Sequence, residues 1–213
     1  MSHQGEEDIF EIVESTENFD FWSEQSFVPS EFKDQVKNAD ILFVPALGYG
    51  ANTSPNFPPL TEELLAYFKE HLPADYKVDI AIGDENSPTL VLNSDYKRFG
   101  KIVITLVAIP VFVNVFSEYI KNKLAESPKP NITIINTTNN QLVPPTVIPQ
   151  QKPIKKTSRA PHRFLEPAKV SFTVTVVDTN GRSIKYDYKG PASEVKKVTD
   201  VIQQDWIKPN DNK

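Results

Sequence analysis

Residues 102–116 constrain this chain more than any other part of its sequence. They form a run of about fifteen residues that is apolar almost throughout, with Pro110 near its middle. Burying one large apolar side chain stabilises a fold by roughly 1.5–3 kcal/mol, so a run of this composition has to be sheltered from water. The sequence therefore predicts that these residues lie in a protein core, in a protein interface or in a membrane.

We expect this run to belong to one long, strongly apolar helix that begins after Ser94, bends at Pro110 and ends at Leu124. Helical spacing of apolar residues continues on both sides of the proline, and a proline inside a helix bends it. Because β-branched residues dominate the first half, a strand over residues 102–108 that turns at Pro110 into a helix is an open alternative. The apolar residues at helical spacing are Phe99, Ile102, Val103, Leu106, Val113, Phe116, Ile120 and Leu124.

The length of the run disfavours a membrane span. A transmembrane helix needs about 20 apolar residues, and extension of the run meets Lys101 upstream and Glu118 downstream. Charges inside a membrane helix are costly, so we expect a buried core helix first and a helix face used for an oligomer or a partner second. The candidate interface residues are Ile102, Leu106, Val113, Phe116 and Ile120.

Periodicity in the rest of the chain predicts an α+β fold in two layers, with a mixed sheet of about five strands and three helices. Asn180 and Gly181 form the turn that most strongly indicates a hairpin, while helices between other strands indicate crossovers. Thr61 can cap a helix that Pro73 stops, and Pro191 can open the last helix. The expected strands are residues 40–46, 77–83, 131–137, 169–177 and 183–188, and the expected helices are residues 61–72, 95–124 and 192–204.

We expect one α/β domain, formed by residues 39–137 and 169–207. Residues 1–38 carry ten acidic residues against two lysines and show no sustained period. They are therefore expected to form an acidic, mostly unstructured arm whose apolar side chains dock onto the core or onto a partner. Residues 138–168 hold six prolines among polar and basic residues, which is typical of an extended insertion loop. Residues 208–213 form a short tail.

Composition excludes several classes of function. The chain has no cysteine, so disulfides, thiolate chemistry and cysteine-based zinc sites are excluded. The residues after Met1 are polar and acidic and lack the pattern of a secretory signal, which predicts a cytoplasmic protein. Residues 152–163 are basic, but the chain has a net charge of −5 and no aromatic ladder accompanies the tract. Nucleic acid is therefore not a predicted partner, and contact with it through this tract is a minor alternative.

A loop at residues 48–54 lies between an expected strand and an expected helix, where open α/β sheets bind ligands. Its glycines would let a phosphate approach the backbone, but it lacks the third glycine of the dinucleotide fingerprint and the lysine of the P-loop. We expect no cofactor, and no metal site because the three histidines are far apart in the sequence. The candidate ligand-binding residues are Gly48, Gly50, Asn52, Thr53 and Asp84.

The expected elements between residues 40 and 204 follow a familiar order. The order begins with a strand (residues 40–46), a helix (61–72) and a second strand (77–82). A long apolar helix broken at Pro110 (102–124) follows, and then come two strands (131–136 and 183–188) and a last helix (192–204). This order resembles that of the effector-associated constant component domains of bacterial conflict systems. Here β-branched and Phe residues replace the Ala and Gly of the family's long helix, and the acidic arm and the proline-rich insertion fall outside it. The resemblance implies a non-catalytic adaptor in a defence or signalling pathway, and it implies no catalytic residues.

These features together predict a non-catalytic interaction or adaptor module that binds a protein partner or a second copy of itself. The first alternative is a nucleotide-binding enzyme or sensor that uses the loop at residues 48–54. The second is a membrane-associated protein that uses residues 102–116.

Overall fold

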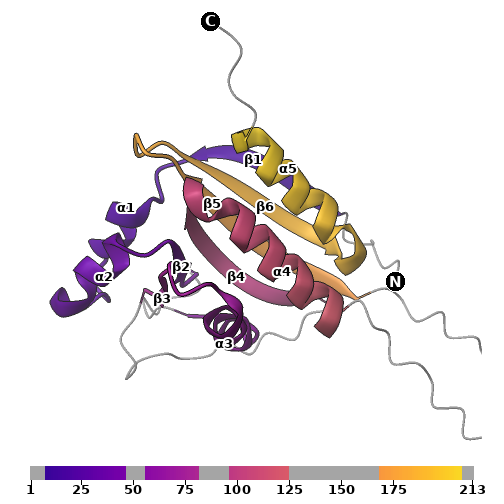
Figure 1. Ribbon diagram of the computed structural model, residues 1–213, viewed down its shortest axis with the longest axis horizontal. Helices are drawn as coiled ribbons and strands as arrows, with labels where there is room; N and C mark the ends of the chain where they lie inside the picture. Colours follow the sequence, from indigo (N-terminus) through magenta and orange to yellow (C-terminus); the bar gives the residue numbers. More distant parts are fainter. Residues whose placement is uncertain (1–7, 47–55, 82–95, 125–167, 208–213) are drawn as a thin grey trace, which may run out of the picture.

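The computed structural model describes residues 8–46, 56–81, 96–124 and 168–207, which form one mixed sheet with helices packed on it (Figure 1). The expected α+β architecture is confirmed, with six strands in place of about five. The strands are β1 (Ile9–Ser15), β2 (Ile41–Val44), β3 (Val78–Ile80), β4 (Tyr96–Thr105), β5 (Lys169–Val177) and β6 (Ser183–Pro191). The helices are α1 (Phe19–Ser23), α2 (Lys33–Lys37), α3 (Thr61–His71), α4 (Ile109–Lys123) and α5 (Val195–Ile207).

The strand order across the sheet is β1-β6-β5-β4-β2-β3. The pairs β4–β5 and β2–β3 are parallel, and all other neighbours are antiparallel. Parallel neighbours need a crossover, and α4 and α3 lie in the chain between them. The predicted hairpin joins β5 to β6, and Gly181 in its turn has a φ of +79°. Asp178 Oδ1 supports this turn by accepting hydrogen bonds from the N–H groups of Asn180 and Arg182, at 2.8 and 2.9 Å.

The prediction of one long apolar helix through Pro110 was wrong. Strand β4 continues to Thr105, a short 3-10 turn (Leu106–Ala108) follows, and α4 begins at Ile109. The β-branched residues before the turn suit a strand in the middle of a sheet. Pro110 lies in the first turn of α4, where its missing N–H has no intrahelical partner to lose, so it starts a helix instead of bending one.

The helix layer of α3, α4 and α5 and one face of the sheet enclose the main core. The ring of Phe116 in α4 is fully buried, and its centroid lies 5.4 Å from that of Phe112 and 4.9 Å from that of Phe172 in β5. Aromatic pairs of this kind add about 0.5–1.5 kcal/mol to the burial of their area. The apolar run is thus sheltered by protein on both sides of Pro110, half as strand and half as helix.

The N-terminal residues from Ile9 to Lys37 are not an unstructured arm, which corrects the prediction for residues 1–38. Strand β1 pairs with β6, and α1 and α2 cover the opposite face of the sheet near β2 and β4. Trp22 of α1 is fully buried there, and Lys101 of β4 lies 3.1 Å from Glu17 in an ion pair beside it. The elements are too short to show a helical period, so the sequence predicts apolar side chains docked on the core or on a partner but not the strand and helices that carry them. The buried apolar residues on this face of the sheet form a second core cluster, which comprises Phe19, Trp22, Val28, Val36, Ala39, Leu42, Val44, Ala81, Val103 and Val177.

Helix α3 is tied to β4 at its first turn. Thr61 is not the N-cap that the sequence suggested, because Leu60 holds that position. The Thr61 hydroxyl instead donates to the Phe99 carbonyl oxygen at 3.2 Å. Next to it, Gly100 sits at a bulge in β4 with a φ of +80°, and a Cβ at this position would lie 3.1 Å from Pro58. The expected strand at 131–137, most of the insertion at 138–168 and the tail at 208–213 lie outside the described residues.

Candidate interaction surface

The five predicted interface residues lie in or against the main core. Ile102 and Phe116 are fully buried, and Leu106 is half-buried against the cluster. Val113 and Ile120 are also buried, but both line a groove between α4 and α5. In the described chain these side chains therefore hold the domain together, and only Val113 and Ile120 reach a surface depression.

The predicted ligand-binding residues cannot be placed in this site. Gly48, Gly50, Asn52 and Thr53 lie outside the described residues, as does Asp84. The basic tract at 152–163 also lies outside them.

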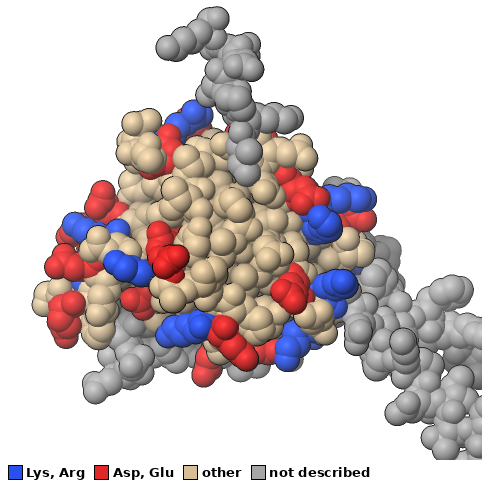
Figure 2. All heavy atoms as spheres, in the orientation of Figure 1, with Lys and Arg blue, Asp and Glu red and all other residues tan. Residues whose placement is uncertain are grey.

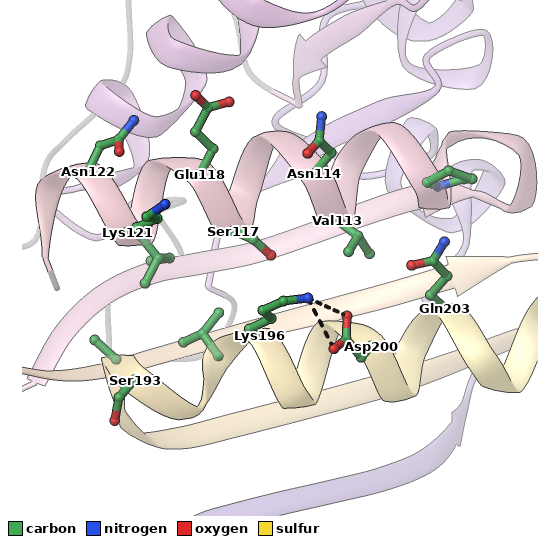
Figure 3. Close-up of a pocket in the computed structure, with 14 residues that line it drawn as sticks. Val113, Asn114, Ser117, Glu118, Lys121, Asn122, Ser193, Lys196, Asp200 and Gln203 are labelled. Carbon is green, nitrogen blue, oxygen red and sulfur yellow. Dashed lines mark hydrogen bonds and ion pairs between the residues drawn. The ribbon is translucent and has the colours of Figure 1, made fainter.

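The groove between α4 and α5 runs along two antiparallel helices (Figure 3). It has a volume of about 920 Å³, and Ser117 and Lys121 of α4 are among the residues that line it. Its polar groups bind one another: the Ser117 and Thr199 hydroxyls are 3.2 Å apart, and Lys196 and Asp200 form an ion pair of 3.3 Å. Among the hydrogen bonds of the described residues, none joins a serine of this groove to a carboxylate or an amine, the pairing that activates a serine for nucleophilic attack.

Figure 2 shows the side of the molecule that carries this groove. Uncharged side chains fill the middle of this view, and the charged ones lie mainly around its rim. Val107, just before α4, is the most exposed large apolar residue of the described chain, at 63%. It stands alone among the exposed apolar residues near α4, and single exposed apolar residues are ordinary on protein surfaces.

At strand β1, in contrast, several exposed apolar residues lie close together. Ile9, Phe10 and Ile12 are 47%, 40% and 46% exposed. Within the described residues, β6 is the only strand that pairs with β1, so β1 ends the sheet. An edge strand presents main-chain N–H and C=O groups to a further strand. Apolar side chains and backbone hydrogen-bonding groups therefore coincide on this edge.

The two faces of β1 have different surroundings. Phe10 and Ile12 lie opposite Tyr188 and Tyr186 of β6, and residues opposite each other in an antiparallel pair share a face. Since Tyr186 and Tyr188 belong to the main core, Phe10 and Ile12 lie on the side of α5. Ile9, Glu11 and Val13 alternate with them and lie on the other face.

A small groove lies between the beginning of β1 and α5. It has a volume of about 250 Å³, and Phe10, Tyr188 and Val198 contribute apolar surface to it. The Tyr188 hydroxyl donates to the Pro191 carbonyl oxygen at 2.8 Å. Burial first, and then the nearby charges of Asp8 and Glu194, together raise the pKa of Tyr188 to about 12. Asp8, Glu194 and Lys197 also line the groove, and Lys197 lies 2.6 Å from Glu194, so Asp8 contributes the charge that is not offset within the groove.

The sequence contained a signal for this surface that we did not interpret as a strand. The segment Ile9–Ser15 is rich in β-branched and aromatic residues, but acidic residues interrupt it in a pattern of three instead of two. Strict alternation, which marks a half-buried strand, is therefore missing.

Across residues 8–46, 56–81, 96–124 and 168–207, no three His, Asp or Glu side chains are placed to hold a metal ion. None of the helices in those ranges combines the length and the hydropathy that crossing a membrane requires.

Comparison with protein-family models, with curated proteins and with solved structures finds no match for this chain. The resemblance to the constant component domains of conflict systems stays a prediction.

Proposed function

We propose that this protein is a non-catalytic interaction module that binds a protein partner through the outer edge of β1. The observation that supports this proposal is the exposure of three apolar side chains on the edge strand β1. Ile9, Phe10 and Ile12 are each 40–47% exposed. Soluble proteins usually shorten, cover or blunt such an edge, because it promotes pairing with another chain. An edge that keeps its length and its apolar side chains is suited to recruit one.

The wider role as an adaptor in bacterial defence or signalling is part of this proposal and derives from the resemblance alone. The membrane-associated alternative required a single helix over residues 102–116, and that helix is replaced by β4 and α4. The nucleotide-binding alternative depends on residues outside the described chain, and nothing in the described chain favours it.

Selection from a random peptide library displayed on phage, with the full chain immobilised, tests the proposal. The matched variants are Phe10→Ser combined with Ile12→Thr, which removes the apolar edge, and Val107→Ser, which removes an exposed apolar residue elsewhere. All three positions are exposed, so each variant should keep the thermal unfolding midpoint of the parent chain. We expect the selected peptides to bind the parent chain and Val107→Ser equally, and the edge variant at least about tenfold more weakly.

Two results would contradict this proposal. One is a selection that enriches no peptide on the parent chain. The other is a set of enriched peptides that bind the edge variant as tightly as the parent chain, which would locate the binding surface elsewhere.

A further inference from the structure

The acidic residues of the β1 edge are evenly spaced. Asp8, Glu11 and Glu14 lie three residues apart, and all three are exposed. Because side chains alternate between the faces of a strand, Asp8 and Glu14 share the α5 side with Phe10 and Ile12, while Glu11 lies on the opposite face. A partner strand therefore meets negative charge on both faces of the sheet.

Glu11 has an unfavourable neighbour within the sheet. The register places it directly opposite Asp187 of β6, and like charges in directly opposite positions destabilise a sheet. Asp187 already accepts a hydrogen bond from the Thr173 hydroxyl, and Lys185 lies 3.1 Å from it. Lys185 thus offsets part of the charge of Asp187, whereas Glu11 forms no ion pair with another described residue and can pair with a cation on the outer side of β1.

The groove beside β1 lies where one face of an added strand would pass. A strand added to a sheet lies about 4.8 Å from its neighbour, so every second side chain of an added segment would face the side of α5. There it meets Phe10 and Ile12 on β1, and Val198 on α5 at the groove. Main-chain hydrogen bonds supply affinity in this mode of binding, and side chains supply specificity.

A second copy of β1 does not suit this edge. The segment Ile9–Ser15 contains two glutamates and no basic residue. Two such strands side by side would bring only like charges to the shared edge, which disfavours self-pairing.

We propose that the partner is an extended protein segment that adds to β1 as a further strand and carries a basic residue at every third position, with apolar residues between. This inference rests on the proposed function. The basic residues lie opposite Asp8, Glu11 and Glu14, and the apolar residues lie opposite the apolar side chains between those acids. Arg182, 3.0 Å from Glu14, offsets part of one charge, so the preference for a basic residue is strongest opposite Asp8 and Glu11.

The probe for this inference is a capped peptide that repeats lysine-valine-valine and ends in lysine. Its control has the same composition with the lysines grouped at one end. We expect the spaced peptide to bind the full chain about tenfold more tightly than the grouped peptide in low salt, and the difference to shrink as salt rises. Isothermal titration calorimetry measures both affinities.

Two further sets of measurements identify the site and the mode of binding. Glu11→Gln should remove most of the preference for the spaced peptide, while Glu62→Gln, an exposed control in the first turn of α3, should leave it unchanged. N-methylation of every second amide of the spaced peptide tests the backbone pairing. One set of alternate positions should abolish binding and the other should be tolerated, because only every second N–H of a strand faces β1.

The outcomes separate this inference from the proposed function. Equal binding of the spaced and grouped peptides overturns the charge pattern, and tolerance of both N-methylated sets overturns strand addition. If library peptides bind the apolar edge of β1 but no lysine peptide does, this inference fails and the proposed function stands. A chain that dimerises through β1 in sedimentation equilibrium, with Glu11→Gln strengthening the dimer, assigns the edge to a second copy and also overturns the inference.

Discussion

The two edges of the sheet are built in opposite ways. At one end, β3 has three residues, all half-buried, and lies against α2 and α3. At the other end, β1 has seven residues, and most of its side chains are exposed. Shortening and covering an edge are the usual protections against pairing with another chain. Among the described residues, β3 has both protections and β1 has neither, so the exposure of β1 is a local property of this edge.

The largest expected difference in unfolding free energy is between substitutions of two phenylalanines, one near each edge of the sheet. Phe43 of β2, next to β3, is fully buried and packs on Phe68. Phe43→Ala should lower the free energy of unfolding by about 3–5 kcal/mol, measured by urea denaturation. Phe10→Ala, at the exposed edge, should change it by less than about 1 kcal/mol. A similar loss for both variants would break the comparison, because β1 would then be part of the core.

A second prediction tests whether the layer behind β1 is firmly packed. Trp206 of α5 donates its indole N–H to the Tyr186 hydroxyl at 2.9 Å, and that hydroxyl donates to Asp205 at 3.3 Å. Tyr186→Phe should cost about 1–2 kcal/mol of unfolding free energy, because it leaves the Trp206 N–H without this acceptor. Trp206→Phe should cost about as much, and the double variant less than the sum of the two. Additive losses would mean that the three residues do not act as one network.

A third prediction concerns alkaline pH at the β1 end. The pKa of Tyr188 is raised to about 12, first by burial and then by the charge of Asp8. The same tyrosine in the unfolded chain ionises near pH 10. Its contribution to stability is therefore complete below about pH 10 and is lost as pH rises toward about 12. Tyr188→Phe should flatten the fall in stability over this range by at most about 1.4 kcal/mol per pH unit. Urea midpoints between pH 9 and 11.5 measure the slope, and parallel curves for parent and variant would contradict the assignment.

The smallest expected effect concerns the ion pair at the far end of β1. Arg182 and Glu14 are 3.0 Å apart, and their side chains are 60% and 81% exposed. Exposed pairs contribute little, so Arg182→Ala should change the unfolding free energy by less than about 1 kcal/mol. Differential scanning fluorimetry at two salt concentrations suffices to check this, and a large, salt-dependent loss would show that the edge is held by charge.

Local sequence signals were sufficient for about half of the architecture. The hairpin at Asn180 and Gly181, the alternating strand β5 and the amphipathic helices α3 and α5 all follow from spacing and turn chemistry. These elements have one buried face each, so the pattern of apolar residues reports which face that is.

The errors at β4 and at the N-terminus have one physical cause. Ile102 and Ile104 face the main core, whereas Val103 between them faces the cluster formed with α1 and α2. A strand covered on both faces shows no alternation and cannot be told from a buried helix by period. A strand over residues 102–108 was the alternative prediction, and the N-terminal arm was expected to dock onto the core or onto a partner. No pattern in the sequence indicated that this arm covers the second face of β4. The candidate edge was missed for the converse reason, since β1 is exposed on both faces and its pattern resembles that of a solvated segment.

The pairing of β1 with β6 also has a consequence for synthesis on the ribosome. Ile9 pairs with Lys189, so β1 is synthesised about 180 residues before the strand on which it pairs. At a translation rate of about 5–20 residues per second, that interval is on the order of ten seconds or more. During this interval, the apolar residues of β1 have no partner strand, and the carboxylates of Glu11 and Glu14 among them favour hydration of the segment until β6 is synthesised.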